Sequence, residues 1–391
     1  MLEKLSPQSR KICMIAVALF FPLLGAGLLL SRQPLDDTAL PVPVRRYAAS
    51  VEQLNVPSQL AVWPWPGAVK DVPHSGVTHW LARDGDGTAV ELFDFDFKAN
   101  PRLRLEIFDQ DQDDARPFDN KVQYVPRGVG QITRQLNAQR RGSIVAAWNG
   151  SFFGYDHKAG GDIAFHIAPV VLNGKVHDWG SNHRWTFGVK YQTGRPVFKA
   201  LHLPKRATLG KEFDWAAGGV QCLRRDGVSL KLQPFPKAAQ TLPKPPIKST
   251  PRDAGHIPLF DHMKSCRVSL GWTRDSRHLY LLYVQEPDTE SASILALLRG
   301  VPSGSAAGQG GWMVSDLQRF WETMQVPNAI NSDAGGVAQL AYRRTDGKYE
   351  LVAPRVGPNP RRMTFTTDFH NAPHGGAIMY FYVRDTAHGT G

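Results

Sequence analysis

The clearest candidate for chemistry is a single carboxylate, Asp333, in the segment NAINSDAGGVAQL. A short apolar strand is predicted to run into this acid, and Ala, Gly and Gly follow it. In one reading, Asp333 only closes a tight turn by bonding to its own backbone. In the other, it is a reactive acid placed where a ligand can approach bare main chain. Gly335 and Gly336 would then let backbone N–H groups reach an oxyanion.

A second polar side chain occupies a similar place earlier in the chain. In GSIVAAWNGSFFG, a buried strand is predicted to end at Asn149, with Gly150 next. Each of the two strands follows a predicted helix, over 129–141 and over 315–326, because apolar residues recur there on one helical face. Polar residues just beyond strand ends often build sites in α/β sheets. The pattern predicts that the two strand ends share one site. In the alternative, the pattern is a coincidence between two common helix-to-strand connections.

The rest of the chain reads mainly as strands. Single strands are predicted in THWLARD, TAVELFDFDF and LRLEIFD, and hairpins in FGVKYQTGRPVF, GVQCLRRDGVSLKL and CRVSLGWTRDSRHLYLLYV. The helix over 315–326 begins with Ser315 and Gln318, which resemble a capping box. Together these segments predict an α+β fold: one mixed, strand-rich twisted sheet with a few packing helices, in a single domain over 75–391. A proline-rich surface loop is expected at 234–258.

Composition and charge narrow the classes of function. The chain has 391 residues, 42% of them hydrophobic, and a net charge of +11, which suits a globular protein with a sizeable core. The basic residues are scattered, without a basic helix or an RNA-binding aromatic signature, so nucleic acid is not expected as a partner. The histidines show no zinc spacing. DQDQDDARPFDN, at 109–120, lacks the glycine and glutamate of a calcium loop and is expected to be a solvated acidic loop. No metal or other cofactor is expected.

The N-terminus predicts a membrane anchor. Residues 12–30 are 19 uncharged, mostly apolar residues, and three basic residues precede them. This length spans a bilayer core, and the positive charge favours a cytoplasmic N-terminus. We expect a signal-anchor over 1–31 and a proline-rich stalk over 32–74. The domain behind them would lie outside the cytoplasm, in the periplasm or beyond the cell. A cleavable signal peptide is the alternative.

Cysteine usage is consistent with that location. Cys13 lies inside the apolar run, which leaves Cys222 and Cys266. Two such cysteines in an oxidising compartment predict a Cys222–Cys266 disulfide, with two free buried thiols as the alternative.

Several motifs, taken in order over about 75–386, resemble the phosphodiester glycosidase family. NGSFF at 149–153 is similar to the family's Asn-Gly-Gly-Tyr/Phe-Phe, and VVLNGKV and FGVKYQTGRPV to the two strand segments that follow it. CRVSLGWTRD is similar to an Arg-Thr-Ala-Ile-Gly strand, which places Arg267 at the family's arginine. NAINSDAGGVAQL is similar to an Asn-Leu-Asp-Gly-Gly-Gly-Ser signature, which places Asp333 at its acid.

The resemblance implies cleavage of the bond between a sugar's anomeric carbon and a phosphodiester oxygen. Asp333 would be the base or nucleophile, and the planar fork of Arg267 would hold the departing phosphate. Asn149 would orient the phosphate or a sugar hydroxyl. Beside Arg267, Asp333 is expected to stay ionised, and the two residues are expected to contribute little to folding. In the structural alternatives, Arg267 pairs with a surface carboxylate and Asn149 only closes its own turn.

Five further residues are candidates for substrate binding. Gly150, Gly335 and Gly336 would let the ligand approach the backbone. Asp162 and His166, in GDIAFHI, follow the first motif and would line the pocket. A lone histidine on a strand is more often structural, so that reading stays open.

These observations predict an enzyme, a membrane-anchored extracytoplasmic phosphodiester glycosidase. Its partners would be a glycan or sugar-phosphate substrate, in envelope or secreted glycans, and the membrane through the N-terminal helix. The chain departs from the family pattern at Ala334, Val337 and Val268, and VQEPD replaces an expected Asp-Gly. These departures favour the alternative: an altered or inactive member of the fold that binds glycans or assists polysaccharide assembly.

Overall fold

The structure is a computed structural model, and it describes eleven segments of the chain. They are 68–84, 88–110, 127–139, 143–156, 163–179, 185–232, 264–285, 311–334, 338–353, 362–365 and 377–386. The predicted anchor, most of the predicted stalk and the proline-rich loop at 234–258 lie outside these segments. None of the helices within them has the length and apolar character that a bilayer crossing requires.

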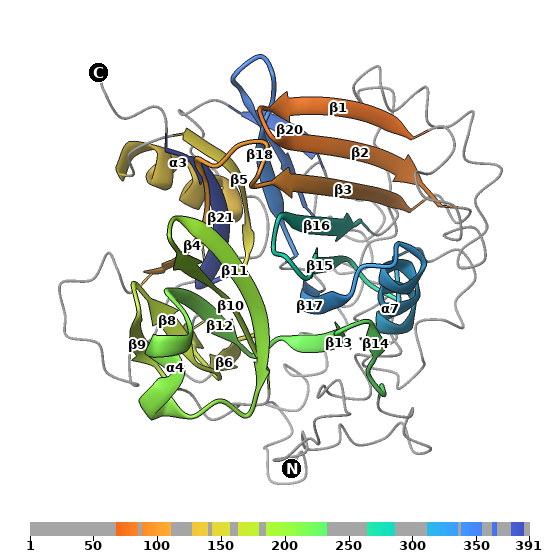
Figure 1. The fold of residues 1–391 in the computed structure, drawn as a ribbon. Helices are drawn as coiled ribbons and strands as arrows, with labels where there is room; N and C mark the ends of the chain where they lie inside the picture. The colour runs from red at the N-terminus through yellow and green to blue at the C-terminus, as the bar shows by residue number, and fades with distance from the viewer. Residues whose placement is uncertain are drawn as a thin grey trace, which may run out of the picture. The chain divides into compact units, whose positions relative to one another are not determined.

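The largest sheet has eight strands in the order β1-β2-β3-β16-β15-β17-β13-β14 (Figure 1). Its strands are β1 (Val69–His74), β2 (Val77–Arg83), β3 (Ala89–Asp96), β16 (His278–Val284), β15 (Arg267–Trp272), β17 (Asn328–Ala334), β13 (Gln221–Arg225) and β14 (Val228–Ser229). Because β1 belongs to this sheet, the sheet includes the last residues of the segment predicted as a stalk.

Two further sheets and a short hairpin contain the other strands of the described segments. The six-stranded sheet contains β20 (Arg362–Phe365), β19 (Tyr349–Val352), β18 (Leu340–Arg343), β5 (Ser143–Asn149), β21 (Met379–Asp385) and β4 (Leu103–Asp109), in that order. The five-stranded sheet contains β11 (Arg195–His202), β10 (Trp185–Gln192), β12 (Trp215–Gly218), β8 (Val170–Leu172) and β9 (Lys175–Asp178). The hairpin pairs β6 (Gly154–Asp156) with β7 (Ile163–Phe165).

The prediction of an α+β fold on one mixed sheet is therefore wrong. Strands make up 56% and helices 14% of the interpretable chain, and its named strands pair antiparallel in several separate sheets. The side-chain pattern of a strand shows that it is half-buried or buried. It does not show which other strand it pairs with through main-chain hydrogen bonds. That pairing determines the sheet to which the strand belongs.

The three predicted hairpins are confirmed as β10–β11, β13–β14 and β15–β16. The first turns at Thr193 and Gly194, with φ of 48° and 78°, and the second at Asp226 and Gly227, with φ of 53° and 89°. Two consecutive residues with positive φ match the right-handed twist of the flanking strands. Local turn chemistry was thus sufficient to place these strand pairs.

Both predicted helices are present, and the described segments contain one further short helix that was not predicted. They are α3 (Val129–Gln139), α7 (Val314–Thr323) and the short α4 (Arg206–Glu212). The apolar face of α3 packs on the six-stranded sheet, and that of α7 packs on the eight-stranded sheet. The capping of α7 does not use the predicted Ser315 and Gln318 pair. Instead, the carboxylate of Asp316 accepts the backbone N–H of Met313 at 2.9 Å.

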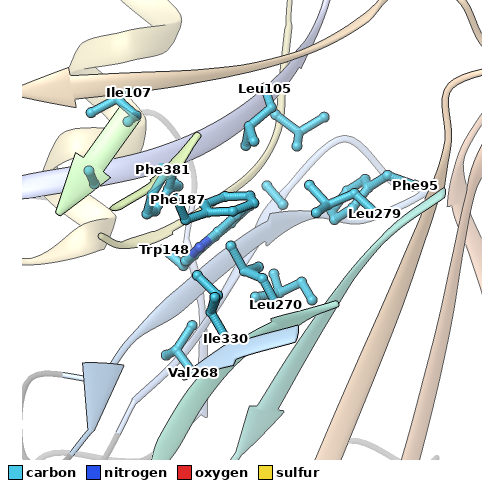
Figure 2. Close-up of a cluster of buried hydrophobic side chains, with 14 of the residues drawn as sticks. Phe95, Leu105, Ile107, Trp148, Phe187, Val268, Leu270, Leu279, Ile330 and Phe381 are labelled. Carbon is cyan, nitrogen blue, oxygen red and sulfur yellow. The ribbon is translucent and has the colours of Figure 1, made fainter. Parts of the chain in front are cut away.

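One aromatic core joins the three large sheets (Figure 2). Phe95 from the eight-stranded sheet stacks on Trp148 from the six-stranded sheet, with ring centroids 6.3 Å apart. Phe187 from the five-stranded sheet lies 5.7 Å from Phe381, which neighbours Trp148 at 6.0 Å. Large aromatic side chains contribute much of the apolar burial of a core. Trp148 precedes Asn149 directly, so this core also fixes the end of β5.

The predicted disulfide is wrong, because Cys222 and Cys266 are buried thiols that are not joined to each other. Cys222 on β13 is level with Ile330 on β17, and Ile330 is level with Leu270 on β15. Cys266 lies four residues before Leu270. Usual strand geometry separates the two cysteines by about 10 Å across the sheet and about 13 Å along it, well beyond the reach of a disulfide.

Candidate active site

The ends of β5 and β17 meet through two side chains. The amide Nδ2 of Asn149, the last residue of β5, donates a hydrogen bond to Oδ2 of Asp333 on β17. Asn149 is fully buried and Asp333 is 1% exposed. The two polar residues that the sequence placed at separate strand ends therefore contact each other, although their strands belong to different sheets.

A β-bulge in β17 sets the approach of Asp333. Val268 on β15 pairs with Asp333, but the next residue, Ser269, pairs with Asn331, so Ser332 is an extra residue. The hydroxyl of Ser332 donates to the carbonyl oxygen of Gly150, just after Asn149. Bulges recur next to active sites because they redirect a side chain. Here the bulge gives the two strand ends a second contact.

The amide of Asn149 has a defined orientation. Its Oδ1 accepts the backbone N–H of Gln339 at 2.9 Å, which leaves its NH2 group to face Asp333. Gly150 is held as well, since its N–H donates to the carbonyl oxygen of Met379 at 2.8 Å. A Cβ at Gly150 would lie 3.0 Å from that same oxygen, so a larger residue there would require the backbone at Met379 to shift by a few tenths of an ångström.

The protonation of Asp333 is dominated by its burial. Desolvation raises its pKa to about 7, against the lowering effects of the Ala334 N–H, the Asn149 amide and the Arg267 charge. The expectation that Asp333 stays ionised beside an arginine fails, because burial penalises the charged form more than its neighbours stabilise it. A carboxyl group with this pKa exchanges its proton near neutral pH, as a catalytic base or acid requires.

Arg267 begins β15 on the face of the eight-stranded sheet that packs against α7. Its Nε–H donates to the carbonyl oxygen of Trp312, just before α7, at 2.9 Å. Ser269 lies two residues along and so on the same face, where its Oγ accepts the indole N–H of Trp321 on α7 at 2.8 Å. Arg267 is 1% exposed, so the alternative of a surface ion pair does not describe it.

Asp333 lies on the other face of the same sheet. Its pairing partner, Val268, points into the central core, and residues paired across a sheet share a face. Arg267 and Asp333 are therefore close along the sheet but start from opposite faces. The charge of Arg267 still acts on both faces: burial raises the pKa of Asp333 and of Asp316 at the start of α7, and the Arg267 charge opposes the rise in each.

His166 has a buried carboxylate partner, Asp109. Its Nε2 lies 2.8 Å from Oδ2 of Asp109, and the side chains are 4% and 0% exposed. Asp109 is the first residue of the acidic segment expected to be a solvated loop and also the last residue of the strand predicted in LRLEIFD; it ends β4 and pairs with Met379. Met379 also accepts the N–H of Gly150. The His166–Asp109 pair is thus two strands away from the Asn149 turn.

The remaining predicted site residues, Asp162, Gly335 and Gly336, lie outside the described segments. Within those segments, no three acidic, histidine or cysteine side chains gather as a metal site would need. The residues missed by sequence reasoning are Ser332, Gln339 and Asp109. Ser332 and Gln339 both belong to the segment NAINSDAGGVAQL, and their place in that segment is the sequence signal for them.

Comparison with known proteins gives similar structures without a family. No family model matches the sequence, and no curated protein matches it. The catalytic domain of zebrafish N-acetylglucosamine-1-phosphodiester alpha-N-acetylglucosaminidase, auto-inhibited by its pro-peptide, is 16% identical, with a TM-score of 0.46, over 80% of this chain and 84% of that chain.

Two bacterial structures are also similar. A hypothetical protein from Synechocystis is 12% identical, with a TM-score of 0.40, over 80% of this chain and 64% of that chain. A protein from Burkholderia pseudomallei, named as exported, is 10% identical, with a TM-score of 0.41, over 76% of this chain and 74% of that chain. None of these identities is high enough to place the chain in a family.

Proposed function

We propose that this protein is a hydrolase that cleaves sugar-1-phosphodiesters between the anomeric carbon and the phosphate oxygen. The observation that carries the proposal is the buried contact between Asn149 and Asp333. Each residue belongs to a motif that resembles the phosphodiester glycosidase family, and the motifs lie far apart in the sequence. A contact between them is what one shared site would require.

The chemistry follows from one titratable carboxyl group. Ordinary glycosidases use two carboxyl groups, one of which protonates the leaving oxygen. A phosphate ester leaves as a stable anion, so the second group is not needed. Asp333, with a pKa near 7, would attack the anomeric carbon or take the proton of an attacking water. The C1–O bond would break with its electron pair on the phosphate.

The neighbours of Asp333 have separate roles in this proposal. The NH2 group of Asn149 would hold the carboxylate in one orientation. Arg267 would act through its charge, which favours the ionised form of Asp333. Its Nε is committed to Trp312, and this argues against an Arg267 whose whole guanidinium fork turns to the substrate.

The proposal includes a location at the membrane. The apolar run at 12–30 with basic residues before it would anchor the chain, with the enzyme outside the cytoplasm. Protease protection in intact cells tests this orientation. Digestion of the domain from outside agrees with it, and protection of the domain until the membrane is opened contradicts it.

One observation favours a non-catalytic glycan-binding protein instead. Both carboxylate oxygens of Asp333 accept hydrogen bonds from the chain itself, Oδ2 from Asn149 and Oδ1 from the N–H of Ala334 at 2.7 Å. A binding protein that has lost its chemistry could retain such a self-satisfied acid. Ala334 also stands where the family pattern has glycine.

The deciding experiment incubates the purified full-length chain with a panel of synthetic sugar-1-phosphodiesters in water enriched in oxygen-18. The proposal expects turnover with the label on the sugar, because the C1–O bond breaks. Label on the phosphate would mean P–O cleavage and would overturn the proposal. Asp333→Asn, which keeps the size of the side chain but not its charge, should lower turnover by at least about a hundredfold. Tight glycan binding without turnover would favour the binding protein.

A further inference from the structure

Gln339 connects the start of α3 to the proposed catalytic pair. It is 1% exposed and directly precedes β18. Its side-chain Oε1 accepts the backbone N–H of Val129, the first residue of α3, at 3.0 Å. Its own backbone N–H donates to Oδ1 of Asn149 at 2.9 Å, and its carbonyl oxygen accepts the N–H of Asn149 at 3.4 Å. Gln339 is therefore bonded to both neighbours at once.

The bond to Asn149 matters because a side-chain amide is asymmetric. An asparagine presents an acceptor on one side and two donors on the other. Since the N–H of Gln339 occupies the acceptor side, the donor side of Asn149 faces Asp333. If the backbone at Gln339 moved away, the side-chain amide of Asn149 would be able to rotate and turn its oxygen toward Asp333. The negative carboxylate would repel that oxygen.

The bond to Val129 holds that backbone in place. The first N–H groups of an α-helix have no partner inside the helix, and α3 has no acidic side chain in its first turn. The side-chain oxygen of Gln339 fills one of these positions. Val129 is itself 1% exposed and packs on the six-stranded sheet, so its N–H gives residue 339 a fixed anchor.

We propose that Gln339 is a positioning residue for Asp333: its side chain ties β18 to the start of α3, and its backbone N–H thereby keeps the NH2 group of Asn149 directed at the carboxylate. This inference rests on the proposed function for its kinetic test only. Its second test reads the proton affinity of Asp333 without any substrate.

Two variants remove the anchor from opposite ends. Gln339→Met keeps the length of the side chain and removes the acceptor. Val129→Pro removes the N–H donor, and proline is well tolerated at the first position of a helix. Leu136→Ala is the matched control, because it loosens the packing of the same helix and leaves the Val129–Gln339 bond intact.

The expected result is a shift in titration. Without a steady donor from Asn149, the ionised form of Asp333 is less favoured, so the midpoint of the rising limb of kcat/KM against pH should move up by about half a unit or more. The turnover number should fall about tenfold or more, through misplacement of the acid. The Gln339→Met and Val129→Pro effects should not add in the double variant, because each breaks the same bond. Leu136→Ala should lower Tm and leave the midpoint unchanged.

The substrate-free test compares each background with and without Asp333→Asn. The pH dependence of that stability difference reports the pKa of Asp333 in the folded chain, and Gln339→Met and Val129→Pro should both raise it. If both variants lower Tm and neither moves this midpoint, Gln339 is only a structural residue and the inference is wrong. If the parent has no turnover but the midpoint shifts, the proposed function fails and the positioning role stands.

Discussion

The amide of Asn149 donates a hydrogen bond to the carboxylate of Asp333, across 184 residues of sequence and between two different sheets. One partner ends β5 of the six-stranded sheet, and the other lies next to a bulge in β17 of the eight-stranded sheet. The contact places a buried carboxyl group with a pKa near 7 between two rigid strand ends, and the first two predictions depend on it.

The stability of the protein should fall as pH rises from about 4 to about 7 through the titration of Asp333. The folded-state pKa of about 7 lies above the ordinary value of 3.8, so the folded state binds the proton more tightly over this window. Asp333→Asn removes the effect and should be more stable than the parent at pH 8, by as much as about 4 kcal/mol. Urea unfolding of both chains at pH 5 and pH 8 measures it. An equal difference at both pH values would contradict the prediction.

The rate of hydrolysis should rise with pH and level off, with a midpoint near 7. A base or nucleophile acts only when ionised, so kcat/KM follows the ionised fraction of Asp333 in the free enzyme. Initial rates on the best sugar-1-phosphodiester between pH 5 and pH 9 give the curve. A rate that instead falls through pH 7 would assign Asp333 the role of a proton donor.

Arg267 should contribute strongly to folding, in contrast to the expectation from sequence. Its side chain is buried between β15 and α7, bonded to the Trp312 carbonyl. Arg267→Met removes this charged donor from the Trp312 carbonyl, which still accepts the N–H of Ser265 at 3.2 Å. Loss of the buried, charge-assisted hydrogen bond should lower the free energy of unfolding by roughly 1.5–3 kcal/mol. Arg277→Met is the control. It breaks the pair with Asp96, in which the Arg277 side chain is 42% exposed, and should change stability far less, because exposed ion pairs contribute little. Equal costs for the two variants would mean that burial of Arg267 has no energetic role.

Cys222 and Cys266 should both react with iodoacetamide only after unfolding. Both are buried in the central core, and burial raises the pKa of the Cys222 thiol, so little thiolate is exposed in the folded chain. Peptide mass spectrometry after labelling with and without denaturant identifies each residue. Reductant should leave Tm unchanged. A peptide pair linked through these two cysteines would contradict the register of β13, β17 and β15.

Local sequence was sufficient for three hairpins, the two longer helices and the two polar strand ends. The turns at Thr193–Gly194 and Asp226–Gly227 are set by residues that accept positive φ. The helices at 129–139 and 314–323 follow from apolar residues spaced at helical intervals. These signals act over a few residues, so they can be read without knowing the rest of the chain.

Only the tertiary structure decided which strand ends meet and which faces the side chains occupy. The division into several antiparallel sheets, the Asn149–Asp333 contact and the separation of Cys222 from Cys266 all depend on strand pairing between distant segments. Main-chain hydrogen bonds make those pairs and leave no side-chain pattern to read. The pKa of Asp333 also depends on the tertiary structure. The sequence suggested a charged neighbour, but burial has the larger effect on this pKa, and the whole fold creates that burial.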